Sequence, residues 1–136
     1  MISTKLIKEI KIYNNDLCNI IKNKIDSNSR NNYLIDYKND YIKIVEKFKI
    51  YRKLDETDIR YKLIVEIYKN RSNDVGDNIS VIDCRLYKNS IDKDDMDLEK
   101  NFILISNFKN DFIDNEYSSI KFQINKLNKF LKDNLD

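Results

Sequence analysis

The sequence predicts an α+β fold with two amphipathic N-terminal helices, a three-stranded antiparallel sheet and a C-terminal helix. The helices are indicated by apolar residues that recur every three or four positions over residues 6–20, 34–51 and 120–131. The sheet is indicated by residues 59–68, where apolar residues alternate with others along the chain. Helices before and after a run of strands are typical of a sheet with helices packed on one face.

The first helix is expected from an apolar stripe that consists of Leu6, Ile10, Tyr13, Leu17 and Ile20. Steps of four and three residues place these side chains on one helix face. Ser3 or Thr4 is the expected N-cap, because a hydroxyl oxygen at that position accepts a hydrogen bond from a free backbone N–H. We expect the helix to end near Asp26, since the polar stretch 27–32 follows.

The second helix is expected over residues 34–51, with an aromatic-rich stripe made of Leu34, Tyr37, Tyr41, Ile44, Phe48 and Tyr51. A helical hairpin with the first helix is the preferred arrangement. The alternative is one long, interrupted coiled-coil helix, because parts of both stripes share a seven-residue register. Ser27 occupies an apolar position of that register, which favours the hairpin.

The first two strands are expected on either side of a turn. Residues 56–69 alternate and are rich in β-branched and aromatic residues, although Ile59, Leu63 and Ile67 also fit a helix that starts at Thr57. The turn lies at residues 70–78, where the only glycine of the chain stands among Asn, Asp and Ser. Alternation then resumes over Ile79 to Tyr87, the second strand.

The third strand is expected at Asn101 to Phe108, and the closing helix has the stripe Ile120, Ile124, Leu127 and Leu131. Ser118 or Ser119 lies near the start of that helix. The length of 136 residues fits one domain, so we assign 1–136 as a single domain. Its helical part is 1–55, and its three strands and closing helix are 56–136.

Cys84 lies in the second expected strand, and its neighbours indicate whether it is a nucleophile. Ile82 and Leu86 share its face of the strand, so Cys84 is interpreted as a small buried apolar side chain. A catalytic cysteine needs a base, usually His, and the sequence has none. Cys18, beside Leu17, is interpreted as packing in the same way.

The composition excludes further classes of site. Phosphate-binding and dinucleotide-binding loops need several glycines, and the chain has one. Two cysteines without His cannot complete a four-ligand zinc site. The acidic residues Asp92 to Glu99 do not fit a calcium-binding EF-hand loop, because Asp97 and Ile103 stand where Gly and Glu are required. We therefore predict a protein that is not an enzyme and has no cofactor or metal, and we interpret the acidic segment as a solvated loop.

The composition also indicates an intracellular protein, cytoplasmic or nuclear and not secreted. There is no apolar run of transmembrane length and no apolar core of a secretory signal. The two cysteines are therefore interpreted as reduced thiols. Asn, Ile, Lys, Tyr and Asp are abundant and have A/T-rich codons, so an AT-rich genome explains them without a function.

Partner binding is expected on the second helix, where aromatic and basic residues lie together. Tyr, Phe and Arg are enriched in interfaces because they bury large areas, and Tyr and Arg also carry a polar group or a charge. The predicted partner-binding residues are Tyr37, Tyr51, Lys43, Lys47 and Arg52. Tyr41 and Phe48 of the same stripe are expected in the core. A stripe this long also predicts a homodimer or a heteromer.

From Phe48 onward the chain contains, in order, "YRKL" at Tyr51 to Leu54, "KLIVEIYKN", "NISVIDCRLYKN", "FILISNF" and the closing "LNKFLKDNLD". This succession resembles the RWD-type globular heads of short coiled-coil kinetochore subunits. In that family a coiled coil leads into such strands and a closing helix. The family's coiled coil is longer, and its glycine after the leucine is Asp55 here. The resemblance implies a dimeric scaffold subunit.

A protein-interaction or scaffold subunit is therefore the preferred function, possible partners being another protein or a second copy of the chain. The alternatives are a small protein of a DNA virus that binds a host factor, and a nucleic-acid-binding module. The net charge of +2 disfavours the nucleic-acid alternative, although the basic residues concentrate in the first half of the chain. No membrane partner is expected.

Overall fold

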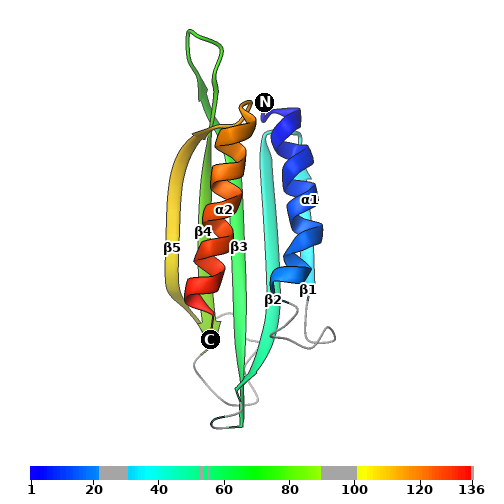
Figure 1. Ribbon diagram of the computed structural model, residues 1–136, viewed down its shortest axis with the longest axis vertical. Helices are drawn as coiled ribbons and strands as arrows, with labels where there is room; N and C mark the ends of the chain where they lie inside the picture. The colour runs from blue at the N-terminus through cyan, green and yellow to red at the C-terminus, as the bar shows by residue number, and fades with distance from the viewer. Residues whose placement is uncertain (22–30, 53, 55, 90–100, 136) are drawn as a thin grey trace.

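The protein consists of one antiparallel sheet with two helices on one face (Figure 1). The computed structural model describes residues 1–21, 31–52, 54, 56–89 and 101–135. The elements, in order, are α1 (Thr4–Ile21), β1 (Asn31–Tyr37), β2 (Tyr41–Arg52), β3 (Thr57–Ser72), β4 (Asn78–Asn89), β5 (Phe102–Ile113) and α2 (Tyr117–Asn134). The strands lie in sequence order, so each pairs with the next one along the chain.

The prediction of a second N-terminal helix is wrong, because residues 34–51 belong to β1, a tight turn and β2. In the turn, Lys38 and Asn39 adopt positive φ angles of 52° and 57°. The Asp40 N–H donates to the carbonyl oxygen of Tyr37 at 3.1 Å, which closes the turn. The described chain therefore has neither a helical hairpin nor a coiled coil, and its sheet has five strands rather than three.

Strand geometry divides the expected helical stripe between two faces. Neighbouring side chains of a strand point to opposite faces, so two residues that are three positions apart also lie on opposite faces. Ile44 and Phe48 are buried beneath the helices, whereas Tyr37 and Tyr51 are exposed on the other face. The proposed division between 1–55 and 56–136 is wrong in the same way, because β2 and β3 pair across it.

The remaining element predictions are confirmed. The Leu6 N–H donates to Ser3 Oγ at 3.1 Å, so Ser3 caps α1. Residues 56–69 lie in or next to β3, a strand and not a helix, and the predicted turn joins it to β4 with Gly76 at φ 86°. The predicted third strand is β5. The predicted end of the first helix near Asp26 and the side chain of Ile20 lie outside the described residues.

The core lies between the helices and the sheet. The α1 stripe residues Leu6, Ile10, Tyr13 and Leu17 are buried, as are Ile120, Ile124, Leu127 and Leu131 of α2. Phe48 of β2 stacks on Tyr61 of β3 with ring centroids 5.4 Å apart. Apolar side chains from both helices and from four strands therefore share one core.

Two buried carboxylates, Asp114 and Glu46, lie at the edges of this core. Asp114 follows β5 and accepts hydrogen bonds from Asn78 Nδ2 at 2.7 Å and from Ser80 Oγ at 2.5 Å. Its backbone oxygen accepts a hydrogen bond from the Ser3 hydroxyl, so it joins α1 to the sheet. Such a fully bonded buried carboxylate fixes the position of its neighbours.

The second buried group is Glu46 of β2, which is fully buried beneath α1. Asn32 of the neighbouring strand donates to its carboxylate. The side-chain amides of Asn32 and Asn14 of α1 exchange two hydrogen bonds of 3.1 Å. This chain of contacts sets the position of α1 over β1 and β2.

Candidate docking surface on the open face of the sheet

The sheet face opposite the helices, called the open face here, carries a mixed layer of aromatic, aliphatic and charged side chains. In the register of the sheet, Tyr37, Tyr41 and Tyr68 form one cross-strand row. The next row holds Ile35, Lys43, Glu66, Asp83 and Lys109. An antiparallel sheet with one uncovered face normally shows polar residues there, so the aromatic and aliphatic residues are the unusual feature.

Three exposed apolar residues follow β1, at one margin of the open face. Tyr33, Ile35 and Tyr37 alternate along this strand and are 47%, 42% and 59% exposed. Their neighbours on β2 include Lys43, which pairs in register with Ile35, and Val45, which pairs with Tyr33. Large apolar groups gathered at one margin are characteristic of an interaction surface.

Lysines lie next to this margin. Lys43, Lys47 and Lys49 alternate on β2 and point to the open face together with Tyr51. Lys49 Nζ lies 3.6 Å from Asp58 Oδ2 of β3, and this ion pair partly compensates its charge. No acidic side chain of β1 or β2 points to the open face within the described strands. The β1–β2 side of the open face is therefore basic.

The centre of the open face is a closed network of charges. Glu66 of β3 forms an ion pair with Arg85 of β4, and Arg85 Nε lies 3.8 Å from Asp83 Oδ1. The Tyr41 hydroxyl donates to Glu66 Oε2 at 2.5 Å. Partial burial, the hydrogen bond to Glu66 and its negative charge raise the pKa of Tyr41 to about 12. The charges of these groups compensate one another, whereas Arg85 Nε is buried without a hydrogen-bond partner.

Lys62 of β3 also points to the open face, where it lies against two aromatic rings. Its ammonium lies 4.8 Å from the ring centroid of Tyr87 and 5.1 Å from that of Phe102. The residue is only 8% exposed, which is unusually low for a lysine. Cation–π attraction to two rings compensates part of the lost hydration. These two rings are therefore already in contact with a cation.

The predicted partner-binding residues lie on the open face of β1 and β2. Tyr37 and Tyr51 are exposed, and Lys43 and Lys47 lie between them on the same face. Arg52 ends β2, and its side chain lies outside the described part of the structure. Tyr41, expected in the core, lies on the open face and is half-buried, whereas Phe48 is buried as expected.

Sequence reasoning missed Tyr33 and Ile35 because they do not fit the helical stripe. The signal in the sequence was that Tyr33, Ile35 and Tyr37 stand at every second position after Asn31. A spacing of two residues is typical of a strand and not of a helix.

Cys84 is buried between the sheet and the helices, as predicted. Burial and the nearby charge of Asp83 raise the pKa of its thiol above the ordinary value, so the reactive thiolate is disfavoured. The side chain of Cys18 and the acidic residues 92–99 lie outside the described residues. Within the described residues, no group of three or more potential metal ligands is found.

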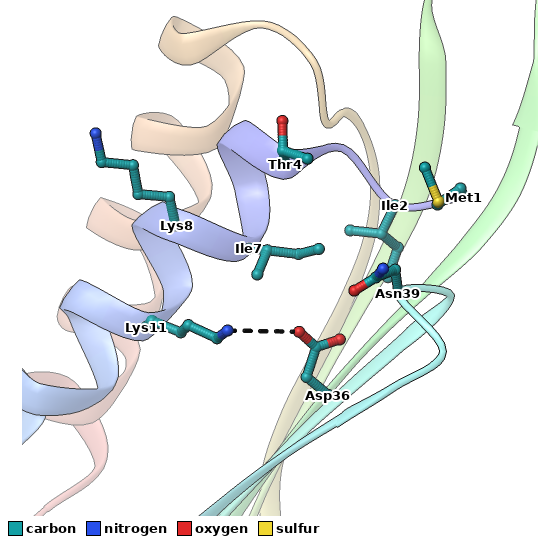
Figure 2. Close-up of a pocket in the computed structure, with 8 residues that line it drawn as sticks. All are labelled: Met1, Ile2, Thr4, Ile7, Lys8, Lys11, Asp36 and Asn39. Carbon is teal, nitrogen blue, oxygen red and sulfur yellow. Dashed lines mark ion pairs between the residues drawn. The ribbon is translucent and has the colours of Figure 1, made fainter.

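A cavity lies on the helix-covered side of the sheet, between the start of α1 and the β1–β2 turn (Figure 2). Its volume is about 380 Å³, and it is lined by Met1, Ile2, Thr4, Ile7, Lys8, Lys11, Asp36 and Asn39. Lys11 Nζ lies 3.7 Å from Asp36 Oδ2 across this cavity. The other oxygen, Asp36 Oδ1, is buried without a hydrogen-bond partner in the described structure.

Comparisons with protein-family models, with curated proteins and with solved structures find no match. Among the described helices, none is long and apolar enough to cross a membrane.

Proposed function

We propose that this protein is a non-enzymatic interaction module that binds an acidic protein partner on the β1–β2 side of its open face. The observation that carries this proposal is the exposed row Tyr33, Ile35 and Tyr37 next to the lysines of β2. Burial of these three side chains by a partner removes a large apolar area from water. The neighbouring positive charge favours an acidic partner and speeds its association.

The same face has features of a single-stranded nucleic-acid platform, because such platforms combine aromatic rings with basic grooves. Two observations favour a protein instead. Two rings of this face, Tyr87 and Phe102, are already in contact with Lys62. Arg85 is bound to Glu66 and Asp83, so its charge is compensated within the sheet. A nucleic acid needs several uncompensated cations, and the net charge of +2 provides few.

Two matched double variants test the proposal by affinity purification from the native host. The variant Tyr37→Ser/Lys43→Glu changes the open face, and Phe122→Ser/Lys129→Glu makes the same changes on the exposed side of α2. We expect the first variant to lose a nuclease-resistant protein partner that the wild type and the second variant retain. Circular dichroism and thermal melting serve as the controls for folding of both variants.

The outcome that contradicts the proposal is the reverse pattern, in which the α2 variant loses the partner. A partner that disappears after nuclease treatment, with binding that weakens steeply as salt is raised, indicates the nucleic-acid alternative.

A further inference from the structure

The outer edge of β1 carries backbone groups that no strand uses. β1 pairs with β2 on one side, and among the described residues no strand pairs with its other side. In an antiparallel pair, every second residue of an edge strand turns its N–H and C=O away from its neighbour. Such an edge can accept a further strand from another chain.

Within the described residues, β1 has few of the features that usually protect a strand edge, and its one charged side chain, Asp36, points to the helix side. It contains no lysine and no proline, and its pairing with β2 has no register shift. The opposite edge strand, β5, is better protected, since it carries Lys109 and Asp111 and a register shift opposite Leu86 and Tyr87. β5 does expose Ile103, Leu104 and Ile105, but these residues lie at that irregularity. The regular, uncharged margin of the open face is β1.

The cavity beside α1 lies next to this edge and can bind a side chain of an added strand. Asp36, on the helix-facing side of β1, contributes to its wall, and Ile2 and Ile7 provide apolar lining (Figure 2). A strand added to β1 would point every second side chain toward this side of the sheet. The volume of about 380 Å³ accommodates an apolar side chain such as valine or leucine.

Positive charge lies on both sides of the same edge. Lys8 and Lys11 of α1 rim the cavity on the helix side, and Lys43 of β2 lies on the open face. Asp36 compensates part of the charge of Lys11, and Glu66 stands opposite Lys43 in the register but is bound to Arg85. An incoming strand would therefore meet lysines above and below its backbone.

We infer that β1 accepts an extended acidic segment of the partner as an additional strand, with one apolar side chain of that segment in the cavity beside α1. The inference rests on the proposed function and specifies the chemistry of the partner. A second copy of the chain fits this edge less well. The β1 strand of a second copy carries only one acidic side chain, Asp36, and would therefore neutralise few of these lysines.

The test uses a synthetic peptide, acetyl-Glu-Glu-Val-Glu-Val-Glu-Glu-amide, which has the seven-residue length of β1. Binding is followed by NMR titration of the isotope-labelled protein. We expect the peptide to bind with contacts between its backbone amides and those of β1, and the analogue with lysine in place of glutamate not to bind.

Backbone methylation separates strand addition from side-chain docking. Two further peptides carry N-methyl groups on the odd or on the even residues, which removes the donors along one side of an extended strand. We expect one of these peptides to lose binding and the other to retain it. If both bind like the parent peptide, strand addition is wrong, while the proposed docking on the open face still stands on its own test.

Protein variants test the cavity and the charge. The variant Lys8→Glu/Lys11→Glu should lower the affinity for the acidic peptide by about tenfold or more at low salt. The matched variant Lys129→Glu/Lys132→Glu changes two exposed lysines of α2 and should leave the affinity unchanged. Thr4→Trp, which fills the cavity, should abolish binding while the protein remains folded.

Four further results overturn the inference. The acidic peptide does not bind, its contacts fall on β5 rather than β1, or oligo-deoxythymidine binds more tightly than the peptide under the same conditions. A concentration-dependent dimer whose interface includes β1 also contradicts it, because the edge is then occupied by a second copy.

Discussion

The helix-covered face and the open face of the sheet differ most clearly on β2, because one strand contributes to both. Ile44 and Phe48 point toward the helices and are at most 2% exposed. Their neighbours Lys43, Lys47 and Lys49 point the other way, together with the exposed Tyr51. The alternation of a strand thus separates residues that hold the fold together from residues that can contact a partner.

The two faces also differ in how deeply their charged side chains are buried. Beneath the helices, Asp114 and Glu46 are fully buried and hydrogen-bonded. On the open face, Glu66 and Arg85 form an ion pair and keep partial contact with water. Loss of a buried charge partner costs more than loss of an exposed one, so substitutions on the two faces should differ in their effect on stability.

The largest effect is expected for Phe48→Ala, on the helix-covered face. The substitution removes a buried ring that stacks on Tyr61, and it should lower the free energy of unfolding by about 3–5 kcal/mol. Chemical denaturation followed by circular dichroism measures this change. A loss below about 1 kcal/mol would show that Phe48 is not part of a packed core.

The next largest effect is expected for Asp114→Ala. The Ser80 hydroxyl would lose its carboxylate acceptor, and Asn78 Nδ2 would keep only the Met1 carbonyl oxygen, which should cost about 2–3 kcal/mol. The matched control is Asp111→Ala, because Asp111 is exposed and its ion pair with Arg71 spans 3.7 Å. The control should change the free energy of unfolding by about 0.5 kcal/mol or less. Equal effects of the two substitutions would contradict the assigned difference between the faces.

A small effect on stability is expected for Tyr51→Ala, on the open face. Tyr51 is 54% exposed, and substitution of such a residue should change the free energy of unfolding by about 0.5 kcal/mol or less. Partner affinity should decrease nonetheless, if the docking surface extends along β2. Thermal melting and affinity purification together measure both quantities, and a melting temperature that falls as far as that of Phe48→Ala would place Tyr51 in the core.

The smallest effect concerns pH and the network at the centre of the open face. The pKa of Tyr41 is raised to about 12, above the ordinary value, so its contribution to stability is fully present below pH ~10 and is lost as the pH rises toward 12. The difference between the tyrosinate absorbance titrations of the wild type and Tyr41→Phe should therefore have its midpoint near pH 12. Glu66→Gln should shift this midpoint to lower pH. A midpoint at the ordinary tyrosine value with Glu66 intact would contradict the network.

Much of the fold could be predicted because several segments have an unambiguous period. The stripes of α1 and α2 and the alternation of β4 give only one interpretation. β1 and β2 could not be recognised because Glu46 stands at an inward position and hides the alternation of β2. The turn between them also contains Lys, Asn and Asp and no glycine, which makes it a weak hairpin signal.

Part of the candidate surface was predicted, but from a helical arrangement that the structure does not have. Tyr37, Lys43, Lys47 and Tyr51 were grouped by their spacing on an expected helix, yet they share a face of two paired strands. Composition alone identified the aromatic and basic region. The contribution of Lys8 and Lys11 could not be predicted, because it depends on how α1 lies over β1.

The most direct test of the central claim, that the open face and not the helical face binds the partner, is site-specific photo-crosslinking in the native host. A benzophenone-bearing amino acid replaces Tyr37 of β1 in one protein and Phe122 of α2 in another, since both side chains are more than half exposed. We predict a nuclease-resistant protein adduct from position 37 and none from position 122. An adduct from position 122 alone, or equal adducts from both positions, would contradict the assignment of the open face as the docking surface.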